Sequence, residues 1–154
     1  MRDRAGHANL RRGKWSHLAR YPGGMLGFSP GGTHDLVQRI EAGFGFGALE
    51  RFGKTSGLPL ATIADILRIP PRTLARRKAT GRLRPEESER LLRFSNLFSK
   101  AMDLFEGDVA AVHRWLTRPN RALGYVPPLS YAKTEVGARE VEDLIMRLEH
   151  GIFS

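Results

Sequence analysis

The sequence contains no cysteine, and this absence excludes several kinds of chemistry at once. A chain without thiols forms no disulfide, offers no thiolate nucleophile and builds no cysteine-based zinc site. It also fits a reducing compartment, where disulfides are rare. No apolar run approaches the roughly 20 residues that span a bilayer, and the N-terminus lacks the apolar core of a signal peptide. We therefore expect a soluble, cytoplasmic protein that does not associate with a membrane.

Acidic residues are the scarcer charge, because 25 lysines and arginines face 16 aspartates and glutamates, for a net charge of +9. The excess is uneven along the chain. Residues 1–34 carry a net +5 and residues 35–100 a net +6, whereas residues 101–154 carry a net −2. A basic balance favours a polyanion such as nucleic acid as partner. The C-terminal third is expected to serve a different partner.

Recognisable catalytic constellations are also missing. No Ser/His/Asp set, paired carboxylates or cluster of metal ligands stands out in the sequence. His113 falls within a predicted helix without a second ligand beside it, which is typical of a structural histidine. We predict that the chain is not an enzyme and uses no metal or cofactor.

Residues 58–84 carry the pattern of a helix-turn-helix. Apolar residues recur at helical spacing from Leu60 to Leu67, as in an amphipathic helix. Pro70 and Pro71 end that helix and begin another, since proline is tolerated at a first helical position and not inside a helix. Gly81 suits a left-handed cap after the second helix. One helix would be held by its apolar stripe, while the next is offered to a groove.

The second of these helices is strongly basic. Seven lysines and arginines fall between Asp65 and Glu86 with no acid among them. A helical wheel turns Leu74 and Ala75 away from a polar face that comprises Arg72, Thr73, Arg76, Arg77 and Thr80. A solvated surface face is the alternative, but this density of cations favours a phosphate backbone. The predicted DNA-binding residues are Arg72, Thr73, Arg76, Arg77, Lys78, Arg82 and Arg84.

The segments before the helix-turn-helix contain many glycines. Residues 1–34 show no sustained periodicity, which predicts a basic, mostly disordered tail. Helical periodicity begins at Asp35. Residues 43–48 (Gly-Phe-Gly-Phe-Gly-Ala) formally match a dinucleotide-binding pattern, which has that meaning only between a strand and a helix. Here a helix precedes it, so these glycines are expected to separate two helices.

Three further helices are predicted after the basic one, with a short helix from Pro128 to Lys133 between the second and the third. The first begins at Pro85, reaches about Glu106 and is apolar on more than one face, which suits either the core of one chain or a homodimer seam. Asp108 is expected to cap the second and Thr134 the last. The chain then ends on Ile152, Phe153 and Ser154, an apolar terminus that either folds back or enters a partner.

Together these residues resemble a known family, the Xre-type antitoxins of RES–Xre toxin–antitoxin pairs. The resemblance covers roughly residues 35–154. Its carriers are residues 69–77 and 81–88, Trp115-Leu116, Pro119-Asn120, Ala122-Leu123-Gly124, Pro128-Leu129, Thr134-Glu135, Gly137-Ala138 and residues 147–154. The ordered series after residue 114 is much more specific than the helix-turn-helix alone. One departure lies at residues 124–127 (Gly-Tyr-Val-Pro), where the family usually has a second glycine and a polar residue.

The resemblance implies an all-α protein, with a helix-turn-helix and dimerisation domain over residues 35–106 and a small helical toxin-binding domain over residues 107–154. It implies a type II antitoxin that binds a RES-domain toxin, occludes the active site at which that toxin destroys NAD⁺, and represses its own operon by binding operator DNA as a homodimer. The toxin-binding residues would be Glu135, Arg139, Glu142, Asp143, Met146, Arg147, Glu149, His150, Gly151, Ile152, Phe153 and Ser154. A free-standing helix-turn-helix transcriptional regulator is the alternative.

Overall fold

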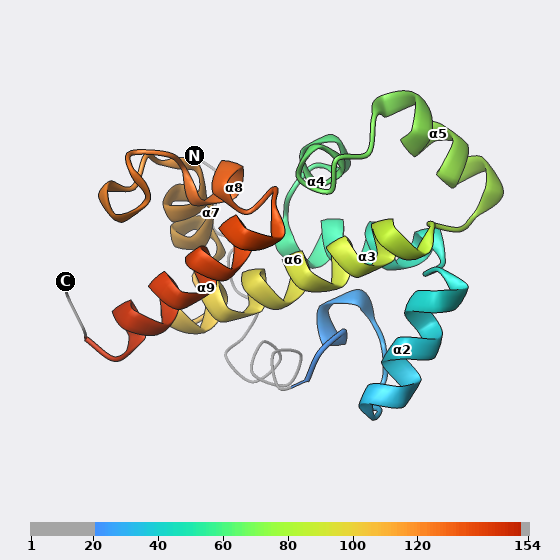
Figure 1. Cartoon of the computed structure of the whole chain (residues 1–154), viewed down its shortest axis with the longest axis horizontal. Helices are drawn as coiled ribbons and strands as arrows, with labels where there is room; N and C mark the ends of the chain where they lie inside the picture. The colour runs from blue at the N-terminus through green and yellow to red at the C-terminus, as the bar shows by residue number, and fades with distance from the viewer. Residues whose placement is uncertain (1–20, 152–154) are drawn as a thin grey trace, which may run out of the picture. The chain divides into compact units, whose positions relative to one another are not determined.

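The computed structural model describes residues 21–151, which fold as helices joined by short turns (Figure 1). Within this range, extended pairing is limited to two isolated bridges, Gly45 with Arg82 and Asn120 with Val126. The predicted all-α class is confirmed. The helices of residues 21–151 are all too short or too polar to cross a membrane.

Two compact units divide the chain, one of residues 21–96 and one that includes residues 97–151, and the division falls inside helix α6. The sequence places the domain boundary after Glu106, just beyond the end of the same helix. The elements are η1 (Gly24–Leu26), α2 (Thr33–Ala42), α3 (Phe46–Ser56), α4 (Leu60–Ile66), α5 (Pro71–Thr80), α6 (Pro85–Leu104), α7 (Val109–Thr117), η2 (Arg121–Leu123), α8 (Pro128–Tyr131) and α9 (Glu135–Glu149).

The core of the 21–96 unit is formed by apolar residues of α3, α4 and the first half of α6. Leu49, Phe52, Ile63 and Leu91 are fully buried. Phe52 of α3 meets Phe94 of α6 edge to face, with ring centroids 5.5 Å apart, an arrangement that aromatic pairs prefer. The buried side of α4 is the apolar stripe that the sequence predicts.

Residues 23–26 belong to this core, so the prediction of a disordered tail over residues 1–34 is wrong for these residues. Met25 and Leu26 are only 2% and 1% exposed, and η1 packs against α3. Gly23 and Gly27 flank η1 with φ of 86° and 84°, values that glycine adopts without steric cost. These two turns bury an apolar pair too short to show periodicity. Residues 1–20 lie outside the described range.

The turn of the helix-turn-helix has a defined hydrogen-bond pattern. The amide of Ile69 donates to the carbonyl of Ala64 (2.8 Å) and that of Arg68 to the carbonyl of Asp65 (3.1 Å), which together form a Schellman motif. Pro71 occupies the first turn of α5, and Gly81 ends that helix with φ of 79°. Both features confirm the sequence prediction.

The glycine-rich segment at residues 43–48 is a structural turn. The amide of Leu83 donates to the carbonyl of Phe44 (2.8 Å), and that of Phe46 donates to the carbonyl of Gly81 (2.8 Å). A Cβ on Gly43 would collide with the carbonyl oxygen of Leu83, so glycine is required for this close approach. Residues 43–45 join α2 to α3, as expected from the sequence.

In the 97–151 unit, α7 packs against α8 and α8 packs against α9. Both predicted caps are present: Asp108 accepts from the amide of Ala111 (3.1 Å), and Thr134 accepts from the amide of Gly137 (3.0 Å). Helix α6 ends at Leu104 rather than at Glu106, because Glu106 takes a left-handed φ of 53°. The core of the 97–151 unit comprises Phe98, Met102, Val112, Leu116, Val141 and Ile145.

Candidate functional site

The exposed side of α5 differs from the face that the helical wheel predicts. Thr73, Leu74 and Arg77 are half-buried and lie on the inner side of the helix. Arg72, Arg76 and Lys78 are exposed, as is Ala75, which the wheel turned away from the basic face. Arg72, Arg76 and Lys78 form what we call the α5 cationic face. These three side chains make no ion pair within residues 21–151.

Arg77 has a structural partner. Its Nε lies 2.8 Å from Oε1 of Glu87, and the two side chains are 11% and 9% exposed. The same Oε1 accepts the amide of Arg84 (2.8 Å), which is the residue before Pro85 at the start of α6. Glu87 therefore completes half of a capping box and holds Arg77 at once. Arg77 links α5 to α6 and does not belong to the α5 cationic face.

Arg82 and Arg84 differ from each other in their partners. Nη1 of Arg82 donates to the carbonyl of Gly43 (2.6 Å) and to that of Ala42 (3.3 Å), at the C-terminal end of α2. A guanidinium at that end of a helix satisfies carbonyls that lack a helical partner. The side chain of Arg84 is exposed and is not paired within residues 21–151. Arg84 extends the charge of the α5 cationic face, while Arg82 has a structural role.

Helix α9 exposes large apolar side chains on the side opposite its core stripe. Val136 is 81% exposed and Met146 is 52% exposed. Arg139 and Asp143 lie between them at helical spacing and are exposed as well. We call this set, Val136, Arg139, Asp143 and Met146, the α9 outer face. It brings together three of the predicted toxin-binding residues.

Other predicted toxin-binding residues of α9 are engaged within the chain. Oε2 of Glu142 accepts from Nζ of Lys100 on α6 (3.0 Å), so Glu142 points toward the body of its own unit. Glu135 pairs with Arg139 one turn along the helix (2.9 Å). That pair is more than half exposed and contributes little to stability. Glu135 is therefore at the edge of the outer face.

A hollow of about 310 Å³ lies at the C-terminal end of α9, lined by Asp143, Met146, Arg147 and His150. Arg147 lies 3.7 Å from Glu140 and is half-buried. Glu149 and Gly151 are exposed at the end of the described chain. Residues 152–154, also predicted to bind the toxin, lie outside the described range.

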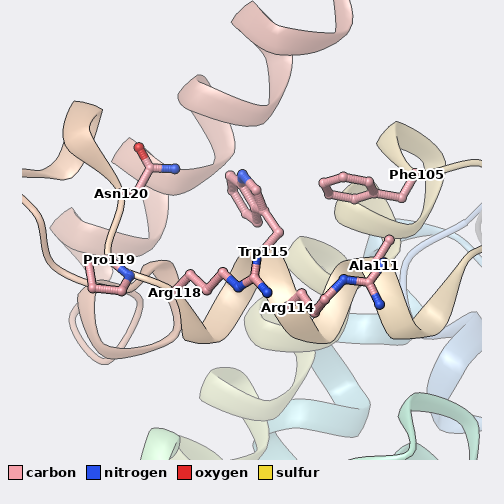
Figure 2. A pocket seen from close by; sticks show the side chains of 7 residues that line it. All are labelled: Phe105, Ala111, Arg114, Trp115, Arg118, Pro119 and Asn120. Atoms are coloured by element: carbon pink, nitrogen blue, oxygen red, sulfur yellow. The ribbon is translucent and has the colours of Figure 1, made fainter.

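A second pocket of about 350 Å³ lies on α7 and the turn that follows it (Figure 2). Trp115 lies between Phe105 and Asn120 in this view, with Arg114 and Arg118 below it. The rings of Phe105 and Trp115 are tilted at 53°, with centroids 6.2 Å apart. Among residues 21–151, no group of three or more His, Asp or Glu side chains is arranged to hold a metal ion.

Two family models match successive parts of the chain. Residues 35–96 match the antitoxin Xre-like helix-turn-helix domain, and residues 100–151 match the antitoxin Xre/MbcA/ParS C-terminal toxin-binding domain. Antitoxin Xre of Yersinia enterocolitica is 43% identical over 120 residues, which cover 77% of this chain and 81% of that protein. This chain belongs to the Antitoxin Xre family.

Two further relatives carry the same name. Antitoxin Xre of Photorhabdus laumondii is 46% identical over 94 residues, which cover 58% of this chain and 64% of that protein. Antitoxin Xre of Pseudomonas putida is 30% identical over 84 residues, which cover 54% of this chain and 52% of that protein. The family resemblance is confirmed, and its two domains support a type II antitoxin, a class of inhibitory regulators rather than enzymes.

Sequence reasoning missed Val136 and the pocket on α7. A signal for Val136 was present, because Val136 and Met146 both fall on the polar side of the last helix, away from Val141, Leu144 and Ile145. No comparable signal existed for the pocket. Its lining comes from α7, the end of α6 and a turn, and only the fold brings these together.

Proposed function

We propose that this chain neutralises a RES-domain toxin that destroys NAD⁺, by laying the α9 outer face and residues 151–154 over the toxin's active site. The observation that carries the proposal is the solvent exposure of Val136 and Met146 on the last helix of the toxin-binding domain. An amphipathic helix of a lone globular protein normally presents charged and polar residues to solvent. Large exposed apolar residues rimmed by charges are typical of an interaction surface.

The magnitudes fit such an interface. Full burial of a methionine or valine side chain contributes roughly 1.5–3 kcal/mol, so these two residues can serve as anchors. Arg139 and Asp143 between them would set the register of docking. Residues 101–154 carry a net −2, which would complement a cation-lined NAD⁺ site on the toxin.

Co-expression with a cognate RES-domain toxin tests the proposal. We expect removal of residues 151–154, or the Met146→Glu substitution, to abolish protection of growth and to let the cellular NAD⁺ level fall. Val37→Glu is the matched control, because Val37 is also a partly exposed apolar residue but lies on α2 in the other unit. Full protection by both altered proteins would show that the toxin is held elsewhere.

We also propose that the chain represses its own operon as a homodimer, with α5 entering the major groove of operator DNA. The α5 cationic face and Arg84 support this role, because they are exposed cations that form no ion pair within residues 21–151. Helix-turn-helix proteins read paired half-sites, which motivates the dimer.

A gel shift on promoter DNA at a series of salt concentrations tests this second role. Replacement of Arg72 and Arg76 by Ala should weaken binding and reduce the salt slope by about one unit for each lost phosphate contact. Arg139→Ala, on α9, is the control and should bind DNA as the unaltered protein does. Absence of any shift by the unaltered protein at low salt would refute the DNA role, and failure to bind the toxin would favour a free-standing regulator.

A further inference from the structure

The pocket on α7 combines aromatic rings with positive charge. It is lined by Phe105, Ala111, Arg114, Trp115, Arg118, Pro119 and Asn120. No aspartate or glutamate lines it, although residues 101–154 carry a net negative charge. Arg114 and Arg118 are exposed and form no ion pair within residues 21–151. The pocket is thus a local cationic site in an otherwise acidic domain.

The helix dipole of α7 gives a simpler, partial explanation for the position of Arg114 and Arg118. They lie at the C-terminal end of the helix, where a cation interacts favourably with the helix dipole. That effect explains a positive charge there. It does not explain why both side chains border a hollow that contains Trp115 and Phe105 (Figure 2).

The loop at the rim of this pocket adds an independent observation. Its ends are joined by the pairing of Asn120 with Val126, and the amide of Tyr125 donates to the carbonyl of Asn120 (2.8 Å). Gly124 and Tyr125 both have φ of 66°. Tyr125 is 68% exposed, so its ring is carried on a left-handed backbone without being buried in return. Strain of this kind is retained where the surrounding structure or the function requires it.

We propose that this pocket is a second anchor for the toxin, and that it receives a carboxylate-bearing side chain from a protruding segment of that protein. The inference rests on the proposed function. Two guanidinium groups match a carboxylate, which arginine binds with paired hydrogen bonds. A pocket of about 350 Å³ on an exposed turn suits a protruding side chain, and tryptophan and arginine, which both line it, are enriched at energetic centres of protein interfaces.

Titration calorimetry with the purified chain of residues 1–154 and a cognate RES-domain toxin tests this anchor. Arg114→Glu and Arg118→Glu should each weaken the complex roughly 10- to 100-fold, because each places a negative charge against the carboxylate. Arg121→Glu is the matched control: Arg121 is exposed on η2 and does not line the pocket, so its reversal should change affinity less than about threefold. Circular dichroism of each variant checks that the helices are retained.

A charge swap makes the test specific. Among toxin variants in which one acidic residue is changed to Arg, one should bind the Arg118→Glu protein at least about tenfold more tightly than the unaltered toxin binds it. Such a gain is expected where two charges are directly paired. If Arg114→Glu and Arg118→Glu bind the toxin as tightly as the unaltered chain while Met146→Glu does not, the second anchor is wrong and the α9 interface stands. If the unaltered chain does not bind the toxin at all, the proposed function itself fails.

Two other outcomes would overturn the proposal by assigning the pocket a different ligand. Loss of promoter DNA binding in the two arginine variants, with toxin binding intact, would make the pocket a nucleic-acid contact. Displacement of the toxin by millimolar inorganic phosphate or ATP, with loss of that effect in Arg118→Glu, would make it a site for a free anion.

Discussion

One carboxylate oxygen of Glu87 serves two groups in the helix-turn-helix unit. It accepts from Nε of Arg77 and from the amide of Arg84, both at 2.8 Å. Glu87 is 7% exposed, so water cannot easily replace the carboxylate as the hydrogen-bond partner of either group. The orientation of α5 against α6 therefore depends on this residue.

Glu87→Ala should lower the free energy of unfolding by about 2–4 kcal/mol, because it leaves a nearly buried guanidinium and a helix-terminal amide without their partner. Urea unfolding followed by circular dichroism measures the loss. Glu89→Ala, at an exposed position of the same helix, should cost less than about 0.5 kcal/mol. Equal effects of the two substitutions would contradict the role assigned to Glu87.

At Tyr125 we expect the stability of the protein and its function to conflict. A non-glycine residue in the left-handed region destabilises the folded state by about 1–2 kcal/mol. Glycine removes this cost, but part of the gain is lost because glycine has more conformational entropy in the unfolded chain. Tyr125→Gly should therefore raise the free energy of unfolding by about 0.5–1 kcal/mol. Tyr125→Ala keeps the strained backbone without the ring and should show no such gain, which urea unfolding of the two proteins will compare.

At the scale of elements, the contact between α8 and α9 requires a glycine. A Cβ on Gly137 would collide with the carbonyl of Tyr131, the last residue of α8. Gly137 also donates its amide to Thr134, so the cap and the close approach occur in the same turn. The orientation of the α9 outer face is set here.

Gly137→Ala should destabilise the protein by about 1–3 kcal/mol, since the added methyl group forces the two helices apart. Gly47→Ala is a control with the same chemical change in α3, where no atom lies within 4 Å of the added Cβ. It should be neutral or stabilise by up to about 1 kcal/mol, because alanine is the better helix former. Thermal unfolding that shifts in the same direction for both proteins would contradict this account of Gly137.

At the scale of the whole molecule, the two proposed surfaces lie on different compact units and carry different charge. The α5 cationic face belongs to the 21–96 unit, and the α9 outer face belongs to the 97–151 unit. Residues 35–100 carry a net +6, whereas residues 101–154 carry a net −2. A polyanion is attracted to the first unit and not to the second.

The two activities should therefore separate in variants. The protein with Arg72 and Arg76 replaced by Ala should lose at least about tenfold in promoter affinity, as expected for two lost phosphate contacts, and should still protect cells from the toxin. The protein that lacks residues 151–154 should bind DNA normally and fail to protect. Loss of both activities in either protein would mean that toxin binding and DNA binding depend on one another.

Local sequence was sufficient to predict the α-helices and many of their ends, but not the 3-10 helices η1 and η2. Pro71 begins α5, Gly81 ends it, and Asp108 and Thr134 cap α7 and α9 as expected. Each of these features depends on residues within about four positions along the chain, so sequence spacing contains the necessary information. The family resemblance likewise rests on ordered motifs that are visible without the fold.

Tertiary structure alone decided which side chains are available to a partner. Arg77 is held by Glu87, ten residues away, and Arg82 by the carbonyl of Gly43, 39 residues away. Glu142 pairs with Lys100, 42 residues away, while Val136 is exposed to solvent. Such pairings depend on how helices pack and not on helical periodicity, since the period of a helix says which residues share a face and not what lies opposite. The pocket of Arg114, Trp115 and Arg118 has the same origin.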